Sequence, residues 1–238
     1  MFRSNSPSHL RAPQRATPTA QALAVSAAFL AALLLAGTEL SLPWLPALAF
    51  GAVVTVVLHG LGRYPHGALG LCNTVTLFRA ALVALLFGAL FDPTFSAWLV
   101  FALASVAFAL DGADGWLARR ARLTSRFGAR FDMETDALLS AVLAVWLVAN
   151  GIAGPEALIL GFARYAFVGA ALALPALGRD LPESFRRKAV CVVQIGTLIV
   201  LLLPVTSASV AAPLAWGAVL LLLWSFAVDI RWLLRRRG

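Results

Sequence analysis

The chain has 238 residues, of which 61% are hydrophobic and only 13% are charged. A soluble domain carries about 25% charged residues, so this composition excludes an ordinary soluble domain. The formal net charge of +8 would suggest nucleic-acid binding in a soluble protein. In a membrane protein it is explained better by cations on cytoplasmic loops, and we expect no nucleic-acid partner. Apolar runs of about 17 to 25 residues recur, each long enough to cross a bilayer, and predict an all-α polytopic membrane protein.

The predicted elements begin with a tail. Residues 1–18 are rich in Ser, Pro and Arg and are predicted to be a disordered basic segment. Pro and Gly residues then mark several of the breaks between apolar runs. Eight membrane-spanning helices are predicted, at about residues 19–38, 42–61, 73–91, 96–121, 131–150, 157–177, 187–204 and 212–234.

The cations test this topology. Residues 39–42, 92–95, 151–156 and 205–212, which form alternate loops, contain no Lys or Arg. Apart from cations in the first or last turns of spans 96–121, 187–204 and 212–234, only Arg79 and Arg164 fall inside predicted spans. The other cations lie in the tail, in the remaining loops or at the C-terminal end: Arg3, Arg11, Arg15, Arg63, Arg119, Arg120, Arg122, Arg126, Arg130, Arg179, Arg186, Arg187, Lys188, Arg231, Arg235, Arg236 and Arg237. By the positive-inside rule both termini are expected in the cytoplasm, with the protein in the inner (cytoplasmic) membrane.

Carboxylates gather where the fourth span meets the fifth. Asp111 and Asp114 are three residues apart, and Asp132 and Asp136 are four apart, so each pair shares a helix face. If the two antiparallel faces meet, four carboxylates converge near the cytoplasmic surface. Such a cluster would be costly without compensation, and hard oxygen ligands suit Mg²⁺, Mn²⁺ or Ca²⁺. We therefore predict a site for divalent cations, of the kind used in phosphoryl chemistry.

Small residues accompany the carboxylates. Gly115 and Ala118 leave room for a flat or bulky ligand, Gly128 allows a close approach, and Arg119 is placed to meet a phosphate. Ordinary interface charge is the favoured interpretation for the remaining arginines of the turn. For Glu134 a solvated or helix-N-terminal position is favoured.

Together these residues resemble a known family. The pattern Asp111-x-x-Asp114-Gly115-x-x-Ala118-Arg119, eight residues, Gly128-x-x-x-Asp132-x-x-x-Asp136 is similar to the motif of the CDP-alcohol phosphatidyltransferases (class I). A second stretch, Asn73-x-x-Thr76-x-x-Arg79, resembles that family's N-x-x-T-x-x-R. The family fold is six transmembrane helices, which would correspond to residues 73–234. The resemblance thus implies a tail (1–18), two extra N-terminal helices (19–62) and a transferase domain (63–238).

The resemblance implies an activity and a set of roles. Family members transfer a phosphatidyl group from a CDP-linked donor, usually CDP-diacylglycerol, to an alcohol, and CMP leaves. Membrane lipids are thus implied as partners, and because many members are homodimers, a homodimer stays open. The implied residue roles are these: Asp111, Asp114, Asp132 and Asp136 hold two divalent cations, Mg²⁺ or Mn²⁺; Asp136 is also the general base; Asn73, Thr76, Asp114, Gly115, Ala118, Arg119 and Gly128 form the nucleotide site.

Several positions keep two interpretations. Asn73 and Thr76 fit either nucleotide contact or N-terminal capping of their helix. Arg79, Arg164 and Lys188 are candidates for binding the acceptor or a phosphate. Arg164 is followed by Tyr165, where many members with phosphorylated acceptors have an acidic residue, so Arg164 also fits a snorkelling or paired cation. Lys188 also fits topology signalling and contact with anionic lipid. The acceptor alcohol stays open.

Two other classes compete with the transferase. A cation-coupled transporter would use the Asp cluster for its ions, but transporters place such groups near the bilayer midplane on broken helices. A catalytically silent membrane scaffold would not require four carboxylates at this spacing.

Overall fold

The computed structural model describes residues 17–235 except 180 and 183, and it does not describe the side chains of Asp114, Pro175 and Ala208. Most of the predicted tail therefore lies outside the described residues. Eight α-helices are described: α1 (Pro18–Ala36), α2 (Leu45–Leu61), α3 (Gly70–Ala89), α4 (Ala97–Ala121), α5 (Arg126–Ala149), α6 (Pro155–Ala173), α7 (Phe185–Leu201) and α8 (Ala208–Arg235). Two short 3₁₀-helices, η1 (Gly37–Glu39) and η2 (Pro175–Gly178), lie between them. No strand occurs in the described part, and the all-α prediction is confirmed.

The N-terminal cap of α5 explains why this helix begins earlier than the predicted fifth span. The predicted fifth span started at residue 131, whereas α5 begins at Arg126. Ser125 is its N-cap, and the Ser125 hydroxyl accepts a hydrogen bond from the Gly128 N–H (3.0 Å). A side-chain cap of this kind satisfies an N–H group that the helix leaves unpaired. The charged first turns of α5, which no apolar pattern reveals, are thus part of the helix.

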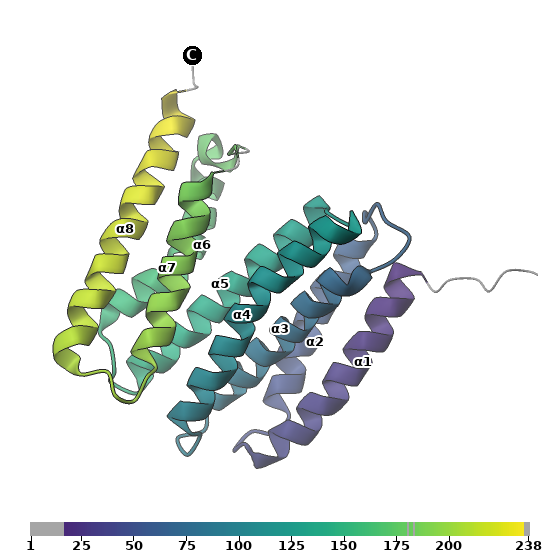
Figure 1. The fold of residues 1–238 in the computed structure, drawn as a ribbon, viewed down its shortest axis with the longest axis horizontal. Helices are drawn as coiled ribbons and strands as arrows, with labels where there is room; N and C mark the ends of the chain where they lie inside the picture. The colour runs from purple at the N-terminus through teal and green to yellow at the C-terminus, as the bar shows by residue number, and fades with distance from the viewer. Residues whose placement is uncertain (1–16, 180, 183, 236–238) are drawn as a thin grey trace, which may run out of the picture.

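Consecutive helices run in alternating directions (Figure 1). The α2–α3, α4–α5 and α6–α7 connections and the end of α8 lie at one end of the bundle, and the other connections lie at the opposite end (Figure 1). Among the described residues, the cation-bearing connections predicted to share one side of the membrane therefore share one end of the fold.

Two apolar cores hold the helices together, and α5 contributes to both. The larger core contains buried side chains of α3 to α8, among them Leu86, Leu143, Leu160 and Leu198. The smaller core joins α1, α2 and α3 and also contains Phe131 from the first half of α5. In Figure 1, α5 lies between the group α1–α4 and the group α6–α8.

Five of the described helices are long and apolar enough to cross a membrane by length and composition: those spanning Pro18–Glu39, Gly70–Ala89, Ala97–Ala121, Pro155–Ala173 and Ser209–Arg235. The segment Leu45–Leu61 is apolar but shorter. The remaining two helices, α5 and α7, each begin with charged turns. The protein is thus a polytopic membrane protein, and the count of eight spans stays a prediction.

Asp92 links two loops at the end of the bundle opposite the α4–α5 connection. Its Oδ2 accepts a hydrogen bond from the Ser41 N–H (3.0 Å), in the loop between α1 and α2. Its Oδ1 accepts from the Thr94 N–H (2.9 Å) and the Thr94 hydroxyl (2.6 Å). These donors stabilise the charged carboxylate, led by the Thr94 hydroxyl, and lower the pKa of Asp92. Asp92 therefore links the N-terminal helices to the α3–α4 loop.

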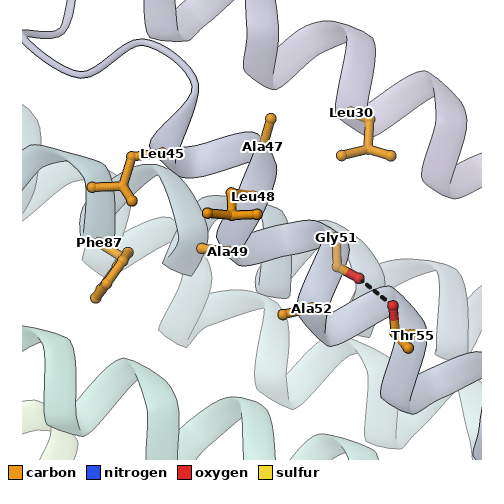
Figure 2. A pocket seen from close by; sticks show the side chains of 9 residues that line it. All are labelled: Leu30, Leu45, Ala47, Leu48, Ala49, Gly51, Ala52, Thr55 and Phe87. Carbon is orange, nitrogen blue, oxygen red and sulfur yellow. Dashed lines mark hydrogen bonds between the residues drawn. The ribbon is translucent and has the colours of Figure 1, made fainter.

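An apolar groove of about 820 Å³ follows α2 and is bordered by Leu30 of α1 and Phe87 of α3 (Figure 2). Thr55 is its one hydroxyl-bearing lining residue, and this hydroxyl donates to the Gly51 carbonyl of the same helix (2.9 Å). The groove offers the hydrocarbon character that suits a lipid-facing surface and no chemical group for catalysis.

Candidate active site

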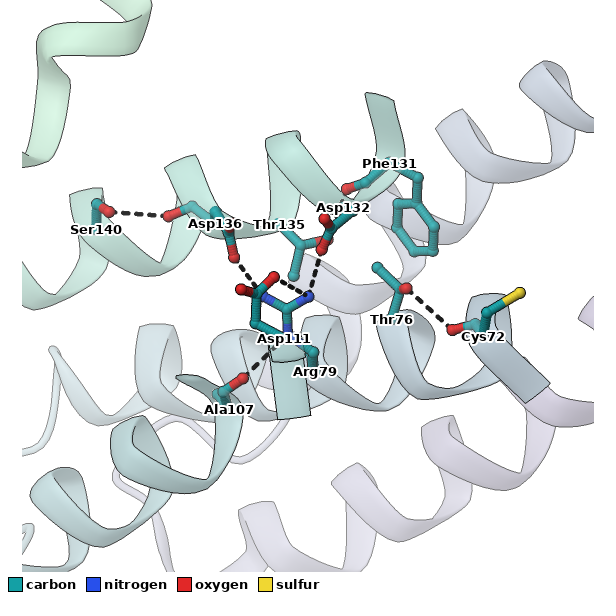
Figure 3. Close-up of polar contacts among 10 residues, drawn as sticks. All are labelled: Cys72, Thr76, Arg79, Ala107, Asp111, Phe131, Asp132, Thr135, Asp136 and Ser140. Atoms are coloured by element: carbon teal, nitrogen blue, oxygen red, sulfur yellow. Dashed lines mark hydrogen bonds and ion pairs between the residues drawn. The ribbon is translucent and has the colours of Figure 1, made fainter. Parts of the chain in front are cut away.

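Arg79 lies at the centre of the carboxylate cluster. Its side chain extends from α3 and is fully buried. Nη1 pairs with Asp111 at 3.2 Å and with Asp132, and Nη2 pairs with Asp136 (Figure 3). Nε donates to the Ala107 carbonyl of α4 (3.0 Å). One guanidinium therefore joins α3, α4 and α5, and its charge offsets part of the repulsion among the carboxylates.

The carboxylates come from two helices, as their spacing predicts. Asp111 extends from α4, and Asp132 and Asp136 extend from one face of α5. One oxygen of each lies within 4.8 Å of the others. The side chains of Asp111, Asp132 and Asp136 are 29%, 36% and 15% exposed, so an ion can reach them from solvent. Asp114 follows in α4, but its side chain is outside the described residues.

This donor set fits a divalent cation. Three convergent carboxylates supply the hard oxygen ligands that Mg²⁺, Mn²⁺ and Ca²⁺ prefer, and their partial exposure leaves room for water or substrate ligands. Arg79 already neutralises one charge, so a cation entering the cluster would share the carboxylates with the guanidinium.

A cavity of about 1110 Å³ opens beside the cluster. Among its lining residues are Asp132 and Asp136 from α5 and Gln194 from α7. The predicted site residues that line it are Asn73, Thr76, Gly115, Ala118, Arg119, Gly128, Asp132, Asp136, Arg164 and Lys188. The structure thus brings most of the predicted site to one space between α3–α5 and α6–α8. Arg79 and Asp111 are not among the lining residues; Arg79 instead meets the carboxylates that border the space.

The capping interpretation of Asn73 and Thr76 is wrong. α3 begins at Gly70 with Leu69 as its N-cap, and no side chain makes the cap hydrogen bond. Asn73 Nδ2 instead donates to the Leu69 carbonyl (2.7 Å) and to the Tyr64 hydroxyl (3.0 Å). The Thr76 hydroxyl donates to the Cys72 carbonyl one turn earlier (3.1 Å). Both side chains are buried in α3 at the wall of the cavity.

The small residues of the motif border the cavity closely. A Cβ on Gly128 would lie 3.2 Å from both Asn73 Oδ1 and Ser125 Oγ, so the absence of a side chain there permits this packing. On Gly115 a Cβ would lie 3.4 Å from Arg119 Nη1, which is ordinary contact. The Arg119 side chain therefore lies back along α4, over Gly115 and toward the cavity it lines.

Arg164 of α6 pairs with a carboxylate of α5. Its Nη2 bonds to Glu134, its Nε donates to Glu134 Oε2 (3.3 Å), and its Nη1 contacts Met133 Sδ at 2.9 Å. Glu134 is half exposed, as expected for a solvated side chain, but it lies well inside α5, so the helix-N-terminal alternative is wrong. The pair faces the cavity through Arg164, whose side chain is 28% exposed.

Asp229 was not among the predicted site residues. It is 6% exposed in α8, pairs with Arg186 and lies 3.3 Å from Arg187 Nη1. Arg186 also donates to the Ser225 carbonyl (2.6 Å). These bonds fix the basic start of α7, next to Lys188, at the cavity wall. A lone carboxylate in the apolar C-terminal helix was the signal, because intramembrane acids are costly and need partners.

Close contact between α5 and α6 holds Arg164 near the carboxylates of α5. A Cβ on Gly161 of α6 would lie 2.4 Å from Ala144 Cβ and 2.9 Å from the Ser140 carbonyl of α5. Small residues permit such an approach between membrane helices. The contact seats α6, and with it Arg164, against the helix that carries Asp132 and Asp136.

The fold and the cluster together define a class: a polytopic membrane protein with convergent carboxylates that could hold a divalent cation. The family model described as CDP-alcohol phosphatidyltransferase matches residues 69–224. Since this is more than half of the chain, the chain belongs to the CDP-alcohol phosphatidyltransferase family. It is a transferase of substituted phosphate groups, from a family that uses divalent metal ions. No curated protein and no solved structure matches the chain.

The family match also bears on the alternatives. The match is to a family of enzymes, so it argues against both a cation-coupled transporter and a catalytically silent scaffold. It begins at residue 69, so α1 and α2 lie outside it, and it ends within α8. The division into a tail, two extra helices and a domain over 63–238 stays a prediction.

Proposed function

We propose that the protein transfers a phosphatidyl group from CDP-diacylglycerol to an alcohol and releases CMP. One observation carries this proposal: the carboxylates of Asp111, Asp132 and Asp136 converge beside a cavity of about 1110 Å³ that is bordered by the remaining motif residues. A cavity of that size accommodates a nucleotide and an acceptor, and the acyl chains of the donor can stay in the bilayer. Membrane lipid is then both environment and substrate.

In the proposed reaction, the acceptor hydroxyl oxygen bonds to the phosphatidyl phosphorus. The bond from that phosphorus to the bridging oxygen breaks, and CMP leaves with the electron pair. Asp136 takes the hydroxyl proton as general base, a role that requires the bound hydroxyl to lie within hydrogen-bond reach of its carboxylate. Its pair with Arg79 sets a condition, because a carboxylate that accepts a proton must give up part of its interaction with the guanidinium.

Asp111, Asp132 and Asp136, with Asp114 as a fourth candidate, would hold two divalent cations, Mg²⁺ or Mn²⁺. When bound, such cations supply positive charge that neutralises the pyrophosphate and the departing CMP. Asn73, Thr76, Gly115, Ala118 and Gly128 would accommodate the nucleotide, with Arg119 near a phosphate.

The acceptor side is proposed from the cations across the cavity. Arg164 and Lys188 line it from α6 and α7, and they would attract an anionic acceptor. Arg164 is already paired with Glu134, so an acceptor phosphate would have to compete with that carboxylate. The same site would stand at the cytoplasmic face, with both termini in the cytoplasm, because the cation-bearing segments share that end of the bundle.

The decisive experiment is transfer by the purified protein. CDP-diacylglycerol and Mg²⁺ or Mn²⁺ would be supplied with one alcohol at a time, and CMP and the lipid product would be identified. We expect CMP release that depends on the alcohol and stops on chelation. Full turnover in excess chelator would contradict the metal site, and absence of CMP release with every alcohol would contradict the donor.

A further inference from the structure

Asn73 of α3 and Gly128 of α5 border the proposed nucleotide site, and we call this part of the cavity lining the nucleotide wall. The loop between α2 and α3 contacts the nucleotide wall through Tyr64. The Tyr64 hydroxyl donates to the Leu69 carbonyl (3.2 Å) and accepts from Asn73 Nδ2 (3.0 Å). Burial raises the pKa of Tyr64 above its usual value, so the hydroxyl keeps its proton and can make both bonds at neutral pH.

These bonds fix the orientation of the Asn73 amide. Nδ2 also donates to the Leu69 carbonyl (2.7 Å), which can only accept, so the nitrogen and not the oxygen must face the loop. Oδ1 is then directed to the other side, where it lies 3.2 Å from the position of a Cβ on Gly128. Asn73 and Gly128 both line the cavity. The loop therefore turns a hydrogen-bond acceptor toward the ligand space.

The N-terminal helices support the same loop. Gln21 of α1 accepts a hydrogen bond from the Leu69 N–H through Oε1 (2.8 Å). The ring of Tyr64 packs edge-on against Phe127 at the start of α5, with ring centroids 5.6 Å apart. Phe127 also packs against Gly60 of α2, where a Cβ would lie 2.7 Å from the ring. Hydrogen bonds and aromatic contacts thus connect α1 and α2 to both helices of the nucleotide wall, α3 and α5.

We propose that the α1–α2 hairpin, with the loop that follows it, is a positioning element for the nucleotide wall, and that Tyr64 is the positioning residue that sets the Asn73 amide. Asn73 Oδ1 then accepts from an N–H or O–H group of the nucleotide. Gln21 and Tyr64 precede residue 69, where the family match begins, so this support belongs to the additional part of the chain. The inference rests on the proposed function, because it takes Asn73 as a nucleotide contact.

Direct binding of CDP to the full-length protein in detergent with Mg²⁺ tests this inference. Tyr64→Phe keeps the ring and removes the hydroxyl, and we expect it to weaken CDP binding about three- to tenfold, the effect of one hydrogen bond. In turnover, the KM for the donor should rise while kcat and the KM for the acceptor stay unchanged. Tyr165→Phe, at the only other tyrosine of the chain, is the matched control and should bind CDP like the wild type.

A double-mutant cycle tests whether Tyr64 acts through Asn73. In an Asn73→Ala background, Tyr64→Phe should have no further effect on CDP affinity, because the amide it orients is gone. If Tyr64→Phe does not yield folded protein, Gln21→Met provides the second variant and should weaken CDP binding in the same direction. Wild-type CDP affinity in these folded single variants, or additive losses in the cycle, would overturn the positioning role alone. A wild-type protein that neither binds CDP nor releases CMP would overturn the proposed function as well.

Discussion

Arg79 of α3 pairs with Asp136 of α5, and the guanidinium is fully buried while Asp136 still borders the cavity. The same guanidinium pairs with Asp111 and Asp132. Arg79 therefore performs, inside the protein, part of the charge compensation that a divalent cation would give.

Replacing Arg79 should make the protein depend on cations for stability. Arg79→Gln leaves three carboxylates without their buried partner, and breaking such a cluster costs about 3–5 kcal/mol. We expect a lower Tm in chelator and a Mg²⁺-dependent increase in Tm larger than that of the wild type, measured in detergent. Arg164→Gln removes a more exposed pair and should cost no more than about 1 kcal/mol. Equal Mg²⁺ responses in Arg79→Gln and wild type would show that the guanidinium and the cation do not share these carboxylates.

Substitutions of Asp132 and Asp136, the two Asp residues of α5, should have different effects. Asp136→Asn removes the proposed proton acceptor, so the single-turnover rate at saturating Mg²⁺ should fall by about 10² to 10⁴ with CDP affinity largely kept. Asp132→Asn should instead weaken Mg²⁺ binding and, with it, donor binding. An Asp136→Asn protein with near-normal single-turnover chemistry would leave Asp136 as a ligand only.

Gly128 should tolerate no side chain without loss of nucleotide binding. The added Cβ of Gly128→Ala would press on Asn73 Oδ1 and Ser125 Oγ at 3.2 Å, and both neighbours are held by hydrogen bonds. We expect CDP affinity to fall about tenfold, in keeping with the cost of overpacking. Gly112→Ala is the control in the same motif, because a Cβ there meets nothing within 4 Å. Equal affinities of the two variants would refute the steric argument.

Acid should weaken the link that Asp92 makes between loops. Its pKa is lowered in the folded protein, so its contribution to stability is present above the unfolded pKa of about 4 and is lost as the pH falls through the lower folded value. Asp92→Asn should therefore have a lower Tm than the wild type at pH 7, and the difference should shrink below pH 4. A difference that does not change with pH would mean that the charge of Asp92 is not what stabilises the loops.

Labelling should decide the orientation in the membrane. In a background with Cys72 and Cys191 replaced by Ala, Ser207→Cys between α7 and α8 should react with an impermeant reagent from outside. Gly67→Cys between α2 and α3 should be protected until the cells are opened. Reaction of both positions from the same side would contradict the alternating topology.

The carboxylate cluster could be predicted from the sequence because its geometry is local. Spacings of three and four place Asp132 and Asp136 on one helix face, and a short turn makes α4 and α5 antiparallel. The partners of the cluster could not be predicted, because they depend on which helices become neighbours. Arg79 was a candidate for binding the acceptor or a phosphate, whereas packing of α3 against α4 and α5 directs its long side chain to the carboxylates.

The orientation of Asn73 depends on a loop with no periodic pattern. Nothing in the stretch around Tyr64 indicates a hydrogen bond to a residue of the next helix, so the sequence cannot separate capping from ligand contact, whereas the start of α3 at Gly70 does. The pairing of Arg164 with a bundle carboxylate was one of the two alternatives, but the identity of that carboxylate, Glu134, required the contact of α5 with α6.

The shared position of α5 limits how the cavity can admit a lipid. Its first half packs with α1–α3 through Phe131, its second half packs in the larger core, and its carboxylates are tied to Arg79. A hinge within α5 would disturb both cores and the ion pairs at once. We therefore expect α5 to stay straight during turnover, with substrate entry and product exit along the cavity between α3–α5 and α6–α8.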